Sequence, residues 1–186
     1  MGTTGTHGVM TALESLGMHG YHWRDSRASA NEHANKSKLP DFVVPLLDKL
    51  GSNVSFNECY KTVESFDFSQ LPSNVDYVSD SPFTEMFLDL YMQFPGAKVV
   101  LTTRPSLEWA KRRKKVHKFT PVPVLRPCGQ SWMLEHYRDQ TLAAMLDAYH
   151  DLVRCVVPPD NLLEIDLFNG DANLTLALSN FLKAAK

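Results

Sequence analysis

Hydrophobic and polar positions along the chain follow two different spacings. Apolar residues that recur three or four positions apart predict helices, and these patterns cover residues 9–16, 40–50, 55–66, 83–94, 107–117, 130–156 and 172–185. Short apolar runs bounded by glycine, proline or polar residues predict strands. The strand patterns cover residues 20–23, 75–79, 98–103 and 162–167. Residues 24–38 and 119–127 follow neither spacing and are predicted to form loops.

The order of these elements predicts an α/β protein, because strands alternate with helices through the whole sequence. Such alternation is typical of a largely parallel sheet with helices on both faces. Residues 98–103 are apolar and β-branched, as expected of a strand that is covered on both faces. No repeat and no change of composition marks a boundary, so residues 1–186 are predicted to form a single domain.

The composition is that of a globular protein, since 44% of the 186 residues are apolar and 22% are charged. The formal net charge of −2 provides no overall field for nucleic acid or for an anionic membrane. The three cysteines form no CxxC pair, and their odd number favours reduced thiols inside the cell. No apolar run approaches the roughly 20 residues of a membrane span, and no secretory signal is recognisable. We therefore expect a cytoplasmic protein without a membrane partner.

The first candidate for chemistry is residues 2–8, a glycine-bearing polar loop that opens the first predicted helix. Such a loop presents unpaired backbone N–H groups and the positive end of the helix dipole. Threonine hydroxyls add donors, and His7 adds a cationic donor when it is protonated. These are the groups that hold a phosphate or a sulfate. The loop lacks the lysine of a Walker A motif, and a threonine cap at a flexible chain start is the alternative interpretation.

Two further candidates follow predicted strands, at the sheet edge where ligands bind in folds of this class. Asp80 follows the strand 75–79 and can accept a proton from an attacking hydroxyl, or can simply cap the next helix. Arg104 follows the strand 98–103, and its planar guanidinium suits a phosphate. The basic run 111–115 is either part of that site or a solvated helix face. It lacks the interleaved aromatic residues of a nucleic-acid surface, so we expect no nucleic-acid partner.

These segments resemble motifs of the sulfotransferase-like P-loop proteins. Residues 4–8, 13–17 and 21–22 resemble the family's opening motif, which runs TGTTSL, then ALE.LG, then YH. Residues 76–82 and 94–105 with Trp109 resemble its strand-end aspartate and its motif YPDAKVILTVRDPE.WY. Residues 161–166 resemble its LLVFDV strand. The similarity follows the family's order through most of the chain except residues 24–70, and the nearest group is the short sulfotransferase family of fungi, algae and bacteria.

The resemblance implies a three-layer P-loop-type fold, in which helices flank a mostly parallel sheet. It also implies a co-substrate, 3′-phosphoadenosine 5′-phosphosulfate, and no metal ion. The loop residues would hold the 5′-phosphosulfate group, and they are Thr3, Thr4, Gly5, Thr6, His7 and Gly8. Arg104 would hold the 3′-phosphate, and Asp80 would take a proton from the acceptor.

The sequence departs from the family pattern at three places. Thr3 stands where relatives carry a lysine or arginine that neutralises the departing phosphate, a contribution of a few kcal/mol that protonated His7 would have to replace. Arg112 stands where relatives have a serine, and it can still contact a phosphate. The apolar strand that should precede the loop is missing, because Met1 stands where that strand should end. Its absence would leave backbone groups unpaired on two neighbouring strands. Either the sequence is a shortened form, or another segment or chain fills the slot, and an empty slot would favour association into a homo-oligomer.

The resemblance therefore predicts a sulfotransferase that moves a sulfuryl group to a hydroxyl or amine of a small molecule. Positioning and electrostatics would supply most of the rate. The alternative is a non-catalytic relative that binds a nucleotide or a protein partner, which Thr3 and Arg112 favour. A P-loop kinase is disfavoured, because the Walker lysine and a Mg²⁺-binding aspartate beside the loop are missing from the sequence.

Overall fold

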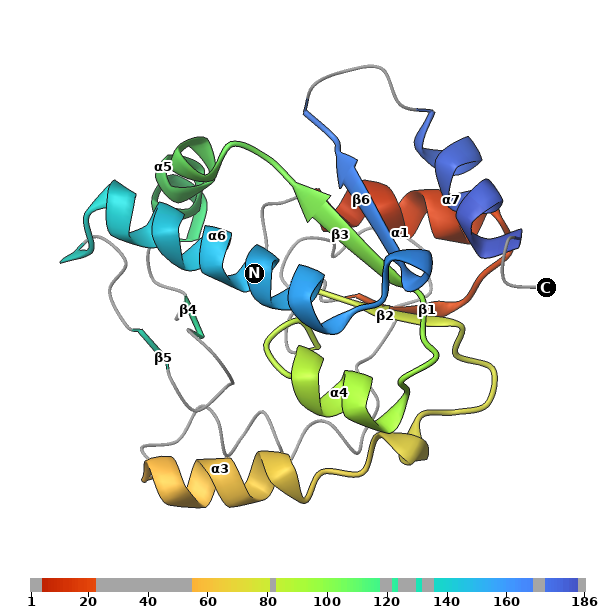
Figure 1. The fold of residues 1–186 in the computed structure, drawn as a ribbon, viewed down its shortest axis with the longest axis horizontal. Coiled ribbons are helices and arrows are strands. Elements are labelled where there is room, and N and C mark those ends of the chain that lie inside the picture. The colour runs from red at the N-terminus through yellow and green to blue at the C-terminus, as the bar shows by residue number, and fades with distance from the viewer. Residues whose placement is uncertain are drawn as a thin grey trace, which may run out of the picture.

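A computed structural model describes residues 5–22, 55–80, 83–117, 122–123, 130–131, 136–168 and 173–183. Helices alternate with short parallel strands in these residues, so the predicted α/β fold of the P-loop type is confirmed (Figure 1). The predicted loop 24–38 and helix 40–50 lie outside the described residues.

Most helices and strands lie close to their predicted positions. The α-helices are α1 (Thr6–Ser15), α3 (Phe56–Glu64), α4 (Phe87–Gln93), α5 (Ser106–His117), α6 (Asp139–Val156) and α7 (Leu174–Lys183). The strands are β1 (Gly20–His22), β2 (Tyr77–Ser79), β3 (Val99–Thr103), β4 (Val122–Pro123), β5 (Gln130–Ser131) and β6 (Leu162–Asp166). Two short 3₁₀ helices, η1 (Phe68–Gln70) and η3 (Pro159–Asn161), precede β2 and β6.

The described strands form three separate two-stranded sheets rather than the single sheet expected from the sequence. β1 runs parallel to β2, with Gly20 opposite Tyr77. β3 runs parallel to β6, with Val99 opposite Leu162. β4 and β5 form a short antiparallel pair. Parallel pairing is thus confirmed in the two sheets that carry the predicted strand ends, but β2 and β3 do not pair with each other.

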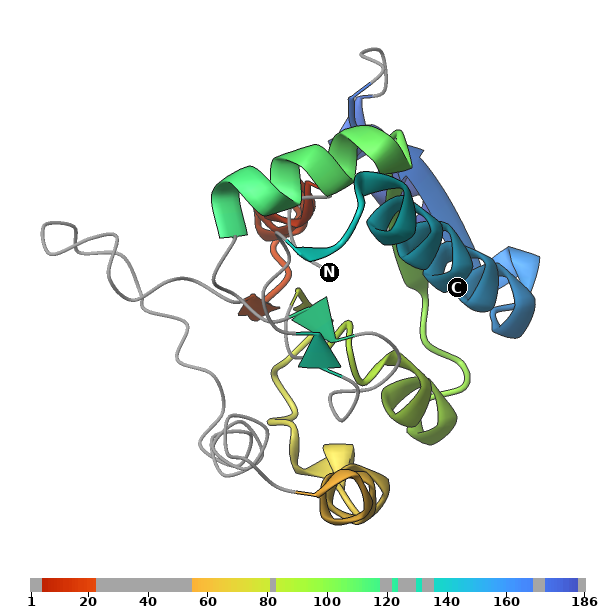
Figure 2. The same cartoon turned by 90° about the vertical axis from the view of Figure 1, so that its left-hand side faces the viewer.

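The β3–β6 sheet lies between two layers of helices, as the three-layer prediction requires. On one face, α1 and α7 share a buried cluster with β6 that includes Leu13, Ile165 and Leu178. On the other face, Val153 of α6 packs against Leu101 of β3. Figure 1 shows α6 in front of β3 and α1 behind the strands, and Figure 2 shows α5 beside α6. Burial of these apolar side chains is the main force that holds the layers together.

Three predicted assignments are wrong in part. The helix predicted over 130–156 begins only at Asp139, and Gln130–Ser131 instead pairs with Val122–Pro123. The pairing holds both segments extended, so part of the predicted loop 119–127 is strand as well. The helical pattern after Pro82 starts with a turn over residues 83–86 and becomes helix α4 only at Phe87. In these places tertiary contacts override a local pattern that fits a helix equally well.

The prediction of three reduced cysteines is also wrong, because Cys59 on α3 is disulfide-bonded. An odd number of cysteines leaves at least one thiol over but does not exclude one bond. Cys155 on α6 is a free and exposed thiol. Across the described residues, none of the helices combines the length and apolar character needed to cross a bilayer.

Candidate functional site

The N-terminal end of α1 is built on Gly5, which has the positive φ of 93° that favours glycine. The Gly5 carbonyl oxygen accepts hydrogen bonds from the amides of Gly8 and Val9, at 2.9 and 3.3 Å. A Cβ atom at Gly5 would lie only 2.5 Å from Leu167 Cδ1, just beyond β6. The backbone therefore makes a tight turn against the end of β6. The first N–H groups of α1 point out of its N-terminal end. Thr3 and Thr4 lie outside the described residues.

The carboxyl ends of β1 and β2 bring a histidine to Asp80. His22 ends β1 opposite Ser79, so Asp80 is the next residue on the neighbouring strand. His22 Nε2 lies 3.6 Å from Asp80 Oδ2 and 3.3 Å from Thr6 Oγ1. The His22 side chain is only 6% exposed, and the Asp80 side chain is 15% exposed. His22 thus connects the predicted anion-binding loop with the predicted proton acceptor.

Asp80 has φ of 62°, a left-handed conformation that is unusual for any residue other than glycine. Its backbone carbonyl accepts the amide of Thr84 at 3.0 Å, which starts the turn over residues 83–86. Its carboxylate faces His22 instead, so the simple capping interpretation does not account for the side chain. Strained conformations of this kind concentrate at functional sites, although strain alone identifies none.

His7 is the exposed member of a histidine pair at the same end of α1. Its ring meets the ring of His22 edge to face, with 5.9 Å between the centroids. A cationic His7 would therefore sit beside the His22–Asp80 pair and remain open to an anion from solvent. Thr6 is half-buried and Gly8 is exposed in the first turn.

Arg104 follows β3 and is held beside the end of β6. Its guanidinium carbon lies 4.0 Å from the centre of the Phe168 ring, a cation–π geometry. Its Nη2 also lies 3.9 Å from the Glu108 carboxylate, one turn into α5. Because Leu167 contacts the Gly5 turn and Phe168 contacts Arg104, a single segment after β6 supports both predicted phosphate-binding elements.

A buried arginine on α5 was not predicted from the sequence. Arg113 is 4% exposed, whereas Arg112 is exposed. Burial lowers the pKa of Arg113, and the negative charges of Glu85 and Asp80 act in the opposite direction. Arg113 lies four residues after the buried Trp109, so the phase of the helix could have revealed it.

The turn that carries Glu85 is tied to α6. The Tyr149 hydroxyl donates a hydrogen bond of 2.7 Å to the Thr84 carbonyl oxygen. Burial raises the pKa of the Tyr149 phenol, and the charge of Glu85 raises it further, so the hydroxyl stays a neutral donor. The Thr84 hydroxyl in turn lies 3.0 Å from Glu85 Oε2. These contacts fix the buried carboxylate near Arg113.

The same end of the sheets therefore gathers His22, Asp80, Arg104 and the Gly5 turn. Arg104, a histidine that can be protonated and the N-terminus of α1 suit the binding of an anion. The Asp80 carboxylate beside them suits proton transfer. Within the described part of the chain, no three His, Cys, Asp or Glu side chains are grouped as metal ligands. His22 could have been anticipated, since it ends the strand that pairs with the Asp80 strand.

These features define the class of protein: an α/β protein of the P-loop type, with a turn suited to an anion at the ends of its strands. The sequence matches the family model described as "Sulfotransferase domain" over residues 1–180. The chain therefore belongs to the sulfotransferase domain family. It is also 32% identical over 106 residues to a protein named "Ava biosynthesis cluster protein M" from Aspergillus versicolor. That similarity covers 57% of this chain and 36% of the relative, so the chain spans little more than a third of the protein it matches.

Proposed function

We propose that the protein transfers a sulfuryl group from 3′-phosphoadenosine 5′-phosphosulfate to a hydroxyl or amine of a small molecule. Membership of the sulfotransferase domain family supports the class of reaction. The observation that carries the proposal is the cluster of Thr6, His22 and Asp80, in which the loop and a strand-end carboxylate meet. Arg104 at the same edge offers a second site for an anion, as a donor with two phosphate-bearing ends requires.

The donor would lie along the strand ends. The 5′-phosphosulfate group would bind the loop formed by Thr3, Thr4, Gly5, Thr6, His7 and Gly8. The open amides of the first α1 turn and the close approach of Gly5 to Leu167 support this assignment. Arg104 would bind the 3′-phosphate, and the exposed Arg112 would add a second cation there.

Asp80 would act as the general base of the transfer. Its carboxylate would take the proton of the acceptor hydroxyl or amine as the acceptor atom forms a bond to sulfur. The bond between sulfur and the bridging oxygen breaks in the same step, and 3′-phosphoadenosine 5′-phosphate leaves with the electron pair. Protonated His7 and the loop amides would stabilise the charge on that leaving oxygen. His22, 3.6 Å from Asp80, would orient the carboxylate.

The second candidate function is a non-catalytic relative that binds a nucleotide or a protein partner. Thr3 favours it, because no lysine or arginine occupies that loop position. Arg112 favours it as well, since it replaces a serine of the family pattern. In this alternative the loop and Arg104 would bind the nucleotide, but no group would be transferred.

Two measurements on the same protein separate these functions. Calorimetry would measure the binding of 3′-phosphoadenosine 5′-phosphate, and a radiolabelled donor would report transfer to a panel of phenols, alcohols and amines. Binding together with transfer in the absence of magnesium supports the sulfotransferase. Binding without transfer supports the non-catalytic relative, and the absence of both contradicts the two proposals. The variant Arg104→Ala tests the proposed contact with the 3′-phosphate in the same binding measurement. Its matched control is Lys115→Ala, which removes an exposed cation from the adjacent helix α5.

A further inference from the structure

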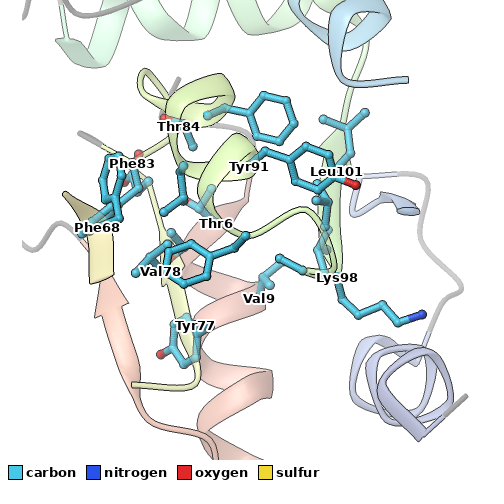
Figure 3. A pocket seen from close by; sticks show the side chains of 18 of the residues that line it. Thr6, Val9, Phe68, Tyr77, Val78, Phe83, Thr84, Tyr91, Lys98 and Leu101 are labelled. Carbon is cyan, nitrogen blue, oxygen red and sulfur yellow. The ribbon is translucent and has the colours of Figure 1, made fainter. Parts of the chain in front are cut away.

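The turn that follows β2 is connected to helix α6 by two hydrogen bonds in series. The Thr84 amide donates a hydrogen bond of 3.0 Å to the Asp80 carbonyl oxygen. The Thr84 carbonyl oxygen accepts a hydrogen bond of 2.7 Å from the Tyr149 hydroxyl. Figure 3 shows the Thr84 side chain at the top of a pocket, on the turn that leads from β2 into α4. The backbone of Asp80 is therefore linked, through Thr84, to a side chain of α6.

The backbone conformation of Asp80 depends on such contacts. Its φ of 62° lies in the left-handed region, which is of higher energy for residues other than glycine. A conformation of this kind persists only where the surrounding structure determines it. The distance of 3.6 Å from His22 Nε2 to Asp80 Oδ2 is longer than a hydrogen bond, so this contact fixes the backbone only weakly. The hydrogen bonds at Thr84 act on the backbone directly, and they hold the segment that follows Asp80.

The Tyr149 side chain is itself held in one position by its neighbours. Its ring lies edge to face with the Phe87 ring, with 6.4 Å between the centroids. Phe87 in turn stacks on Tyr91, with 5.6 Å between the centroids. Tyr149 also packs against two buried clusters, one that contains Leu146 and one that contains Val153. A side chain that is locked by packing presents its hydroxyl in a fixed direction.

Helix α6, which carries Tyr149, is fixed to the neighbouring helix α5. Lys114 Nζ lies 2.8 Å from Asp139 Oδ1, in the first turn of α6. The Ser106 hydroxyl at the start of α5 donates a hydrogen bond of 3.1 Å to the Asp147 carboxylate. The two helices also share a buried apolar cluster. The donor that reaches the turn after β2 therefore belongs to a packed pair of helices rather than to a loop.

We propose that Tyr149 is a positioning residue for Asp80. Its hydroxyl holds the backbone of Thr84, and the Thr84 amide keeps Asp80 in the left-handed conformation in which its carboxylate faces His22. The carboxylate then accepts the proton of the acceptor without first having to reorient. This catalytic consequence rests on the proposed function, whereas the effect of Tyr149 on the conformation of Asp80 does not.

The first test measures amide hydrogen exchange in the full chain without ligand, so it needs no activity. Tyr149→Phe removes the hydroxyl but keeps the ring and its contact with Phe87. The matched control is Tyr91→Phe, which removes a hydroxyl from another ring of the same aromatic stack. We expect the Thr84 amide to exchange about tenfold faster in Tyr149→Phe and at an unchanged rate in Tyr91→Phe, with the amides of β6 as the internal reference. An unchanged exchange rate of Thr84 in Tyr149→Phe overturns the proposal.

The second test compares transfer to two acceptors in the same mildly alkaline buffer. Phenol keeps its proton there and needs a general base, whereas 4-nitrophenol has already lost its proton and needs none. We expect Tyr149→Phe to lower kcat for phenol by about 10- to 100-fold at an unchanged KM, and to leave kcat for 4-nitrophenol nearly unchanged. Equal losses for both acceptors, or a higher KM at an unchanged kcat, overturn the proposal, because a role in positioning the base would not produce them.

The two tests distinguish a failure of this proposal from a failure of the proposed function. If the original protein transfers a sulfuryl group to no acceptor of the panel, the proposed function fails, and the exchange rate of Thr84 alone decides whether Tyr149 holds Asp80. If the original protein transfers the group but Thr84 exchanges at the same rate in Tyr149→Phe, the proposed function stands and the positioning role of Tyr149 is refuted.

Discussion

The free-energy cost of placing a side chain at the Gly5 turn can be predicted by comparing Gly5 with Gly17. Gly5 lies close to Leu167, whereas Gly17 has open space around it. Gly5 and Gly17 lie at opposite ends of α1 and both have positive φ, 93° and 81°. A Cβ at Gly17 would meet no atom within 4 Å, whereas a Cβ at Gly5 would lie 2.5 Å from Leu167 Cδ1. Gly17→Ala therefore measures the backbone effect alone, and Gly5→Ala adds the steric conflict.

An alanine in the left-handed conformation costs about 1–2 kcal/mol. Overpacking of a filled site adds about 1–3 kcal/mol. We expect Gly17→Ala to lower the free energy of unfolding by about 1–2 kcal/mol and Gly5→Ala to lower it by about 2–5 kcal/mol. For a chain of this size, each kcal/mol corresponds to about 2–4 °C in Tm. Urea denaturation and calorimetry of the two variants measure the difference.

A third variant separates the steric part of the effect. In a Leu167→Ala background the conflicting Cδ1 atom is gone, so Gly5→Ala should lose only the backbone contribution of about 1–2 kcal/mol. Binding of 3′-phosphoadenosine 5′-phosphate should weaken in Gly5→Ala and remain unchanged in Gly17→Ala. The reasoning is refuted if Gly5→Ala and Gly17→Ala destabilise equally, or if Leu167→Ala leaves the effect of Gly5→Ala unchanged.

Three further outcomes are expected. Arg104→Ala should weaken binding of 3′-phosphoadenosine 5′-phosphate by about 1.5–3 kcal/mol in calorimetry, and unchanged affinity would remove Arg104 from the site. Asp80→Asn should abolish sulfuryl transfer but preserve nucleotide binding, and full activity in that variant would exclude Asp80 as the base. Hydrogen bonds from Arg154 at 2.8 and 2.9 Å lower the pKa of Glu164. The pair therefore stabilises the fold fully at pH values above the unfolded-state pKa of about 4.3. This stabilisation is lost as the pH falls through the lower folded-state pKa. Arg154→Met should therefore destabilise the protein more at pH about 7 than at pH about 3 in urea denaturation, and an equal effect at both pH values would contradict the assignment.

The strand ends could be predicted from the sequence because local composition determines them. Apolar and β-branched residues mark β3, and polar residues at its carboxyl end place Arg104 at the sheet edge. Asp80 follows β2 for the same reason, and its position after the strand is confirmed. The Gly5 turn likewise follows from glycine and the helical pattern after it. The roles of these residues in binding and catalysis stay predictions.

Contacts between distant segments could not be predicted in the same way. His22 reaches Asp80 only because β1 pairs with β2, and strand pairing is a non-local property. Arg113 stands next to Arg112 in a basic run, and only the helix phase relative to Trp109 turns one inward and leaves the other exposed. The extended conformation of Gln130 and Ser131, which were predicted to be helical, likewise depends on their pairing with β4.

The two residues that follow β6 contact both of the predicted phosphate-binding elements. Leu167 sits under the Gly5 turn, and Phe168 sits under the Arg104 guanidinium. In the proposed function, the two anionic ends of the donor would therefore be bound by groups that contact one short segment of backbone. A displacement of that segment would move the Gly5 turn and Arg104 together. The effects of substitutions at these two positions on ligand binding should therefore be energetically coupled rather than additive.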